Sequence, residues 1–173
     1  IYTCLNRDGS LIDTTKSVWF QGRFAFTCSY AYNHIEQNLD WLAAAKSTLD
    51  FIEHHCFDSD GRMFFEVTAS GEPIRKRRYV FSETFAAIAM AEYAIASGER
   101  AYAEKALNLF KDIQRFLRTP GILEPKYCET VHTKGHSIVM ILINTASRIR
   151  AAIADPILDQ QIDDSIALLK KDF

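Results

Sequence analysis

The stretch that decides the fold runs from Phe81 to Arg118 and reads FSETFAAIAMAEYAIASGERAYAEKALNLFKDIQRFLR. Its first part, residues 81–97, is apolar on most sides of a helix, which is typical of a helix that is buried on most sides. Its second part, residues 99–118, has apolar residues at helical spacing and charged residues between them, which predicts an amphipathic outer helix. Gly98 is suited to end the first helix. The stretch therefore predicts a helical hairpin with one inner and one outer helix.

The same pair of helices is predicted on both sides of this hairpin. Upstream, residues 15–33 are apolar on most sides and residues 38–56 are amphipathic. Downstream, residues 135–154 are apolar on most sides and residues 157–171 are amphipathic, with Pro156 at a helix start. The pattern predicts an all-α protein built from about three helical hairpins.

Short β-hairpins are predicted between these helices, within a weak internal repeat. Residues 1–13 alternate as strands do around an Asp-Gly turn, and residues 62–74 form a second hairpin. A shift that places Gly9 on Gly71 also places Trp19 on Phe81. Repeats with alternating buried and amphipathic helices predict hairpins stacked in a ring or solenoid. In a ring, the residues just before each inner helix meet at one mouth, where we expect the chemistry.

Composition limits the classes of function. The chain has 173 residues, of which 48% are hydrophobic and 24% charged, with a formal net charge of -2. These values indicate one globular domain over residues 1–173 and argue against disorder or coiled coil. Its apolar runs are shorter than the roughly 18 residues that a membrane span needs. The near-neutral charge gives no global field for nucleic acid or a membrane, so we expect neither as a partner. A small, uncharged or weakly charged ligand is favoured.

The four cysteines are Cys4, Cys28, Cys56 and Cys128, and they form no CxxC pair. They show no metal-like spacing with the five histidines, so no metal site is predicted. We expect reduced, mostly buried thiols in a cytoplasmic protein. The chain begins at Ile1 without an initiator Met and ends in a helical pattern, so we expect it to be a piece of something longer.

The most informative short stretch for function is KSVWFQGRF, residues 16–24. Gly22 within a helix costs roughly 1 kcal/mol relative to alanine, and Arg23 in an apolar helix must find a partner or cavity water. The functional interpretation is that Gly22 permits close approach, Trp19 stacks on a sugar face and Arg23 donates hydrogen bonds to oxygens. The structural interpretation is a packing tryptophan and an arginine that reaches the surface.

Other candidate residues also have two interpretations. Glu83 lies near the start of the second inner helix. Either the helix dipole stabilises its charge there, or Glu83 faces the cavity and pairs with Arg23. The basic run 75–78 is either a solvated turn or a phosphate site at the following helix. His132 and His136 flank the start of the third inner helix, where a histidine can shuttle protons, but this signal is weak alone.

Five motifs are informative together: NRDG (6–9), KSVWFQGR (16–23), FDSDGR (57–62), YVFSETFAA (79–87) and MILIN (140–144). They resemble the N-acylglucosamine 2-epimerase family, also called renin-binding proteins. The resemblance covers essentially the whole chain and is most specific in WFQGR and FSETFAA. It implies an (α/α)6 toroid, of which this chain would supply roughly the N-terminal half as a single domain.

The resemblance implies interconversion of N-acetylglucosamine and N-acetylmannosamine. A proton leaves the carbon next to an open-chain aldehyde and returns on the other face, which needs two acid/base groups and a cation near the oxyanion. Arg23 matches the family's active-site arginine, and we expect Trp19 and Glu83 to bind substrate. The family's catalytic histidines lie in the C-terminal half, so no histidine here inherits that role and the chain alone is expected to be inactive. No cofactor is required, although ATP stimulates some members.

Alternative functions stay open at this point. The chain resembles relatives that isomerise mannose or epimerise cellobiose, and a non-catalytic protein-interaction fragment is a further alternative. A glycoside hydrolase on a similar toroid would need two carboxylates, and Glu83 is the only well-placed one, which disfavours that class. The expected partners are a sugar and, as an assembly, a second copy in a homodimer.

Overall fold

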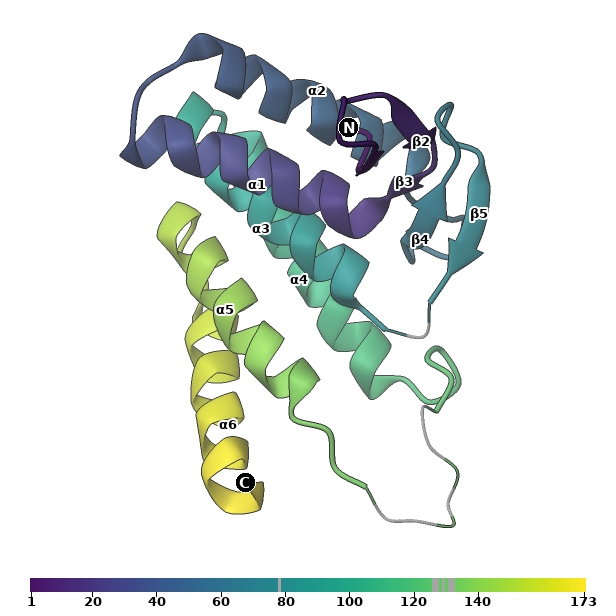
Figure 1. Ribbon diagram of the computed structural model, residues 1–173. Coiled ribbons are helices and arrows are strands. Elements are labelled where there is room, and N and C mark those ends of the chain that lie inside the picture. The colour runs from purple at the N-terminus through teal and green to yellow at the C-terminus, as the bar shows by residue number, and fades with distance from the viewer. Residues whose placement is uncertain (78, 126–127, 129, 131–132) are drawn as a thin grey trace.

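The computed structural model describes residues 1–77, 79–125, 128, 130 and 133–173. Its helices form three consecutive hairpins, as predicted, with bounds within a few residues of those expected (Figure 1). The helices are α1 (Val18–His34), α2 (Leu39–His55), α3 (Phe81–Ser97), α4 (Arg100–Arg118), α5 (Ser137–Ala152) and α6 (Pro156–Asp172).

The helices form an inner and an outer layer. The inner helices are α1, α3 and α5, and α3 lies between the other two and packs against both. Each inner helix also packs against the helix that follows it in the chain, so α2, α4 and α6 form the outer layer. This arrangement is three hairpins of an α/α toroid.

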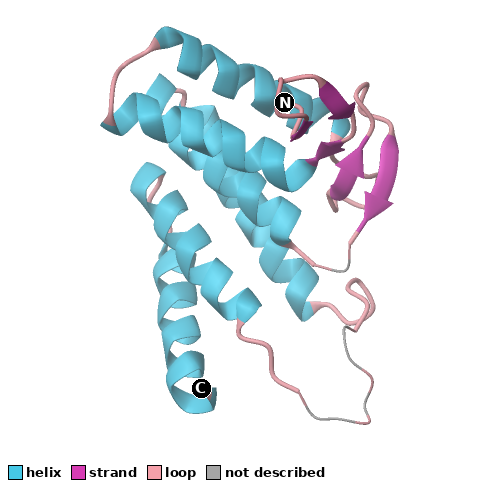
Figure 2. Ribbon diagram, in the orientation of Figure 1, coloured by secondary structure: helices cyan, strands magenta, loops and turns pink. Residues whose placement is uncertain are grey.

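Short strands gather at one end of the first two hairpins (Figure 2). Strands β1 (Cys4–Leu5) and β2 (Leu11–Asp13) form the predicted first hairpin. The second hairpin, β4 (Phe64–Val67) and β5 (Pro73–Lys76), is joined by β3 (Lys16–Ser17) in a three-stranded antiparallel sheet. The sequence did not predict β3, which ties the entrance of α1 to the second hairpin.

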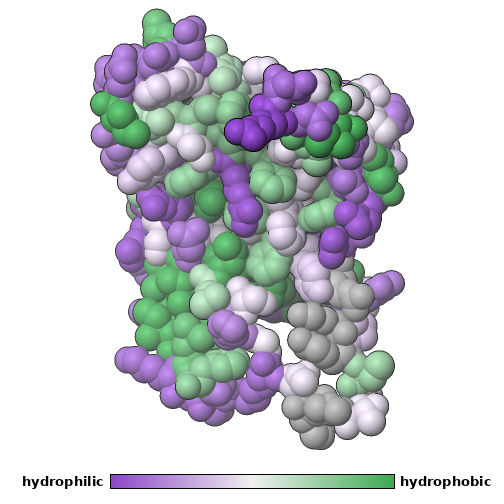
Figure 3. All heavy atoms as spheres, in the orientation of Figure 1, coloured by the Kyte–Doolittle hydropathy of each residue, from purple (hydrophilic) through white to green (hydrophobic). Residues whose placement is uncertain are grey.

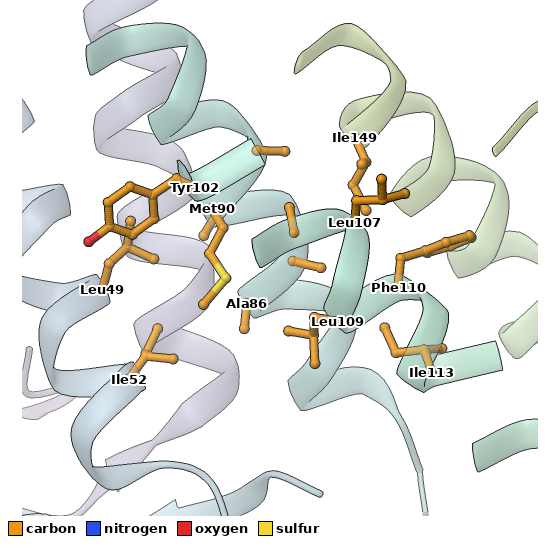
Figure 4. Close-up of a cluster of buried hydrophobic side chains, with 14 of the residues drawn as sticks. Leu49, Ile52, Ala86, Met90, Tyr102, Leu107, Leu109, Phe110, Ile113 and Ile149 are labelled. Carbon is orange, nitrogen blue, oxygen red and sulfur yellow. The ribbon is translucent and has the colours of Figure 1, made fainter. Parts of the chain in front are cut away.

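The core is centred on α3. Every residue from Ser82 to Ala94 is buried, which confirms the prediction for this helix. Figure 4 shows Ala86 and Met90 of α3 among side chains of the neighbouring helices, including Ile52 of α2 and Phe110 of α4. The small alanines of α3 let helices pack closely on several sides of it.

The other two inner helices are less buried than predicted. On α1 only five residues are buried, and on α5 only Leu142, Thr145, Ala146 and Ile149 are. Phe20 is 47% exposed and Met140 is 49% exposed. The prediction that both helices are buried on most sides was wrong, because α3 has inner neighbours on both sides whereas α1 and α5 each pack against one. Figure 3 shows apolar residues gathered on the surface over α5 and α6.

Helix ends agree with the sequence in part. Gly98 ends α3 with a φ of 74°, a left-handed conformation that favours glycine. Helix α6 begins at Pro156 as predicted. Serine is a common N-cap residue, but the N-cap of α3 is Val80 rather than Ser82, and the helix begins at Phe81. Ser82 is buried within the first turn.

All four cysteines are free, but they are not mostly buried. Cys4 and Cys128 are exposed and Cys28 is half-buried. Only Cys56 is fully buried, and burial raises the pKa of its thiol to about 12. At neutral pH this thiol is protonated and unreactive.

No helix in the described part of the chain is long and apolar enough to cross a membrane.

Candidate functional site

A cavity of about 400 Å³ lies between the N-terminal parts of the three inner helices. This is the mouth at which the sequence analysis expected the chemistry. Helix α1 supplies Trp19 and Arg23, so two of the three predicted site residues meet here. The remaining lining residues come from α3 and α5: Phe81, Phe85, Ser137, Met140, Ile141 and Asn144.

The side chain of Arg23 projects into this cavity without a polar partner. Its guanidinium lies over the ring of Phe85, 4.2 Å from the centroid, and its side chain is exposed. Among the described residues it makes no side-chain hydrogen bond and no ion pair. A guanidinium presents five N–H donors in a rigid fork. The Phe85 ring therefore holds a cation whose donors are free to bind oxygens of a ligand.

Gly22 makes this placement possible. A Cβ added there would lie 2.8 Å from the carbonyl carbon of Phe85 and 2.9 Å from its Cβ. Such distances leave no room for any side chain, so α1 and α3 touch at this point. The sequence-based interpretation of Gly22 as a point of close approach is confirmed, and this approach brings Arg23 over Phe85.

We expect Gly22→Ala to destabilise the protein by about 1–3 kcal/mol, because overpacking a tight helix contact outweighs the gain in helix propensity. Urea unfolding measures this difference. Gly135→Ala is the control, since nothing lies within 4 Å of an added Cβ there, and it should change stability by no more than about 0.5 kcal/mol. A stabilising effect of Gly22→Ala would contradict the close approach.

Trp19 forms one aromatic wall of the cavity. Its ring lies edge-on to Phe65 and Phe81, with centroids 5.1 Å and 5.4 Å away, and tilted against Phe85 at 5.8 Å. Edge-on pairs of this kind stabilise a fixed ring orientation. The half-buried indole is thus held rigidly beside the cation of Arg23.

Glu83, the third predicted site residue, has a different partner from the one expected. Its side chain is 0% exposed, and its Oε1 accepts hydrogen bonds from Arg62 Nε at 2.6 Å and from the backbone N–H of Met63 at 3.0 Å. Arg62 is 3% exposed and also donates to the carbonyl of Tyr79. The predicted ion pair between Glu83 and Arg23 was wrong. Glu83 is not among the residues that line the cavity, and its contact with substrate stays a prediction.

The ion pair between Arg62 and Glu83 joins the turn before β4 to the first turn of α3. The sequence analysis quoted Arg62 only within a motif and gave it no role. Its signal was a basic residue directly after an Asp-Gly turn. In the described part of the molecule Glu83 Oε2 accepts no hydrogen bond. The pair fixes the start of the helix that carries Phe85.

Asn144 was not predicted as a site residue. It belongs to the inner helix α5, and its exposed side chain lines the cavity together with Trp19 and Arg23 of α1. Its amide makes no hydrogen bond with a described residue. The available signal was a single polar residue at the end of an apolar run. The cavity thus offers a second polar group, which can donate or accept.

The basic run lies on a strand rather than in a turn, because Arg75 and Lys76 belong to β5. Arg75 forms an ion pair with Glu66 at 3.1 Å. Lys76 forms ion pairs with Asp58 and Asp60, and its hydrogen bond holds the pKa of Asp58 below the usual range. Arg75 and Arg77 are exposed, so the expectation that the run is solvated holds for them, whereas the expected turn was wrong. Arg78, at the end of the run, lies outside the described residues.

No histidine of the described residues lines the cavity. His136 lies against Phe173 and is not among the lining residues. His132 lies outside the described residues. No group of three or more His, Cys, Asp or Glu side chains in the described ranges is arranged to hold a metal ion.

Comparisons with known proteins bear on the family and the fold of the chain. The sequence profile described as N-acylglucosamine 2-epimerase matches residues 1–145. N-acylglucosamine 2-epimerase of Rattus norvegicus is 29% identical over 154 residues, which cover 86% of this chain and 37% of the relative. A sugar epimerase from a ruminal bacterium has a TM-score of 0.83 at 19% identity, and the match covers 98% of this chain and 48% of the epimerase chain. Cellobiose 2-epimerase from Bacillus thermoamylovorans has a TM-score of 0.84 at 17% identity, and the match covers 96% of this chain and 47% of that epimerase.

The chain therefore spans less than half the length of these relatives. The structural likeness shows the predicted (α/α)6 fold, of which three hairpins are present. The profile covers most of the chain, including both stretches that carry Trp19, Arg23 and Phe85. The chain belongs to the N-acylglucosamine 2-epimerase family.

Proposed function

We propose that this chain forms part of a sugar 2-epimerase that interconverts N-acetylglucosamine and N-acetylmannosamine. The observation that carries the proposal is the guanidinium of Arg23, which lies 4.2 Å from the centre of the Phe85 ring and has no polar partner among the described residues. A cation in a partly apolar cavity is suited to bind an oxygen on which negative charge develops.

The proposed reaction proceeds by proton transfer at C2 of the open-chain sugar. A base removes the C2 proton, the electron pair forms a C1–C2 double bond, and O1 takes the negative charge. Arg23 stabilises this oxygen, and return of a proton on the other face of C2 completes the inversion. The described residues at the cavity supply the cation but no acid/base pair. We expect that pair to be two histidines in the C-terminal half, as the resemblance to the family implies.

The other predicted site residues have distinct roles in this proposal. Trp19 provides a rigid aromatic surface for the sugar beside Arg23, as its contacts with three phenylalanines support. The burial of Glu83 and its bonds to Arg62 and Met63 support a positioning role, which keeps Phe85 beneath the cation.

The proposal is tested by sugar binding and by hydrogen exchange at C2. In a Trp41→Phe background, Trp19 is the remaining tryptophan, so its fluorescence should respond to N-acetylglucosamine. In the form of the protein that turns over sugar, NMR in D2O should show deuterium entering at C2. Absence of both signals would overturn the proposal. We expect the 173-residue chain alone not to interconvert the two sugars, and turnover by it would contradict the assignment of the acid/base groups.

A related sugar is the second candidate substrate. The solved relatives include a cellobiose 2-epimerase and a D-mannose isomerase, and the same removal of a C2 proton serves both reactions. An aldose–ketose isomerase would return the proton to C1 instead of C2. Product analysis with cellobiose, mannose and N-acetylglucosamine separates these candidates. The proton transfer itself requires no cofactor. A role of ATP as an effector stays a prediction. The cytoplasmic location also stays a prediction.

We expect the chain to associate into a homodimer or larger species, because apolar side chains remain exposed on the inner and outer helices. Phe20, Met140, Ile166 and Leu168 are 47%, 49%, 38% and 42% exposed, respectively. Exposed apolar patches of a few hundred Å² normally find a partner. Light scattering should show a mass above that of a monomer, and a hydrophobic dye should bind. Leu168→Lys should weaken both signals, whereas a monodisperse, dye-silent parent chain would contradict this expectation.

A further inference from the structure

A second arginine of the inner layer lacks a polar partner. Arg148 of α5 is half-buried, and its guanidinium lies over the rings of Phe26 and Tyr30 of α1, at 5.4 Å and 5.5 Å from their centroids. In the described part of the chain it makes neither an ion pair nor a hydrogen bond. It thus repeats the arrangement of Arg23 over Phe85.

Other partly buried cations in the described part of the chain do have a carboxylate partner. Arg62 pairs with Glu83, and Lys76, whose side chain is 29% exposed, pairs with Asp58. A half-buried guanidinium without such a partner has lost part of its hydration without a compensating bond. The aromatic rings offset some of that cost, but they leave its N–H donors unused. An external anion would complete the site.

A cavity of about 450 Å³ adjoins Arg148, and it borders the one at Arg23. Its lining includes Asn144, Ser147 and Arg148. Met140 and Asn144 line both cavities. Asn144 and Arg148 lie one helical turn apart, roughly 6 Å along the axis of α5. The inner face therefore presents a hollow with a free cation at each end and a free amide between them.

We propose that Arg148 binds an anionic group, a phosphate or a carboxylate, at the end of the sugar remote from C1. This proposal rests on the proposed function, in which C1 and C2 lie at Arg23. An open-chain sugar extends its last carbon away from C1 along the carbon chain, which would follow the hollow past Asn144. The planar guanidinium fork binds two oxygens of phosphate or carboxylate at once. The subsite would let the cavity take an acidic or phosphorylated sugar in addition to the neutral N-acetylhexosamines.

Calorimetric titration of the full chain with three sugars tests this subsite. The ligands are N-acetylglucosamine, its 6-phosphate, and glucuronic acid as the carboxylate. Arg148→Met keeps an unbranched apolar stem over Phe26 and Tyr30 but removes the charge. Arg150→Met is the matched control, because it removes the same charge from the same helix at the position that pairs with Asp159.

We expect the better anionic sugar to bind about tenfold more tightly than the neutral one. This advantage should persist in Arg150→Met and disappear in Arg148→Met. The anionic sugar that binds more tightly shows whether Arg148 prefers a phosphate or a carboxylate. The proposed subsite would be overturned if both variants lost the tighter binding of the anionic sugar equally, or if the parent chain bound anionic and neutral sugars equally well. Binding of the neutral sugar without any advantage for the anionic ones would leave the proposed function intact, whereas no binding of any sugar would contradict both.

Folding of each variant is checked by circular dichroism. Should Arg148→Met fail to fold, the salt dependence of the parent chain gives the answer. A contact between charges weakens with ionic strength, so the advantage of the anionic sugar should shrink as salt is added. An advantage that salt does not change would overturn the subsite.

Discussion

Arg23→Ala is expected to lower kcat/KM for N-acetylglucosamine by more than about tenfold in the form of the protein that turns over sugar. Loss of one donor to a developing oxyanion typically costs about 3 kcal/mol. Because Arg23 has no polar partner among the described residues and lies on Phe85, its removal breaks no ion pair there. The free energy of unfolding should therefore change little, which separates a role in catalysis from one in stability.

Arg23→Lys should restore part of the turnover, since a lysine supplies charge without the planar fork. Arg100→Ala is the control, because the Arg100 side chain is 81% exposed and pairs with Glu104 on the outer layer. Steady-state kinetics of the three variants decide the matter. Normal turnover by Arg23→Ala would show that Arg23 is structural.

Glu83→Gln is expected to produce the largest loss of stability, about 3–5 kcal/mol. Removing one partner of a buried ion pair leaves the other charge without compensation. Here the remaining charge is Arg62, which is 3% exposed against Glu83 at 0%. Urea denaturation of parent and variant gives the difference in the free energy of unfolding.

An exposed ion pair provides the comparison for this effect. Lys46→Ala removes a partner of Asp50, and both side chains are about two-fifths exposed, at 39% and 43%. Such pairs contribute about 0–1 kcal/mol. The double variant Arg62→Met/Glu83→Gln should recover part of the stability lost in Glu83→Gln, because no unpaired charge remains. Equal changes in the free energy of unfolding for Glu83→Gln and Lys46→Ala would show that the buried pair stabilises the protein no more than an exposed one.

The helical hairpins were predictable because they depend on local patterns. The apolar residues of 81–97 and the amphipathic spacing of 99–118 are visible in any short window. The degree of burial was not, because it depends on which helices lie on each side. Helix α3 has an inner neighbour on both sides, whereas α1 and α5 have one. Strand β3 was missed because Lys16 pairs with Val67, a partner far away in sequence.

The site was predictable where a motif carried it. Trp19 and Arg23 came from one short stretch, and the structure brings both to the cavity. The partner of Glu83 was not predictable. In the sequence Arg62 is the last residue of a turn, and only the folded chain brings Arg62 to the start of α3. Asn144 and Arg148 each appear as one polar residue in a helix, a pattern that does not tell which side faces a ligand.

The central position of α3 has a consequence for how the cavity is assembled. The third hairpin packs against the rest of the molecule mainly through contacts of α5 with α3, with fewer contacts of α5 with α4. We expect local opening to follow the hairpin boundaries, because cooperative units of unfolding often coincide with supersecondary motifs. The cavity wall thus belongs to two blocks: Arg23 and Phe85 stay together within the first, while Asn144 and Arg148 arrive with the second. Docking of the last hairpin would then create the full binding surface in one step, around a cation that is already in place.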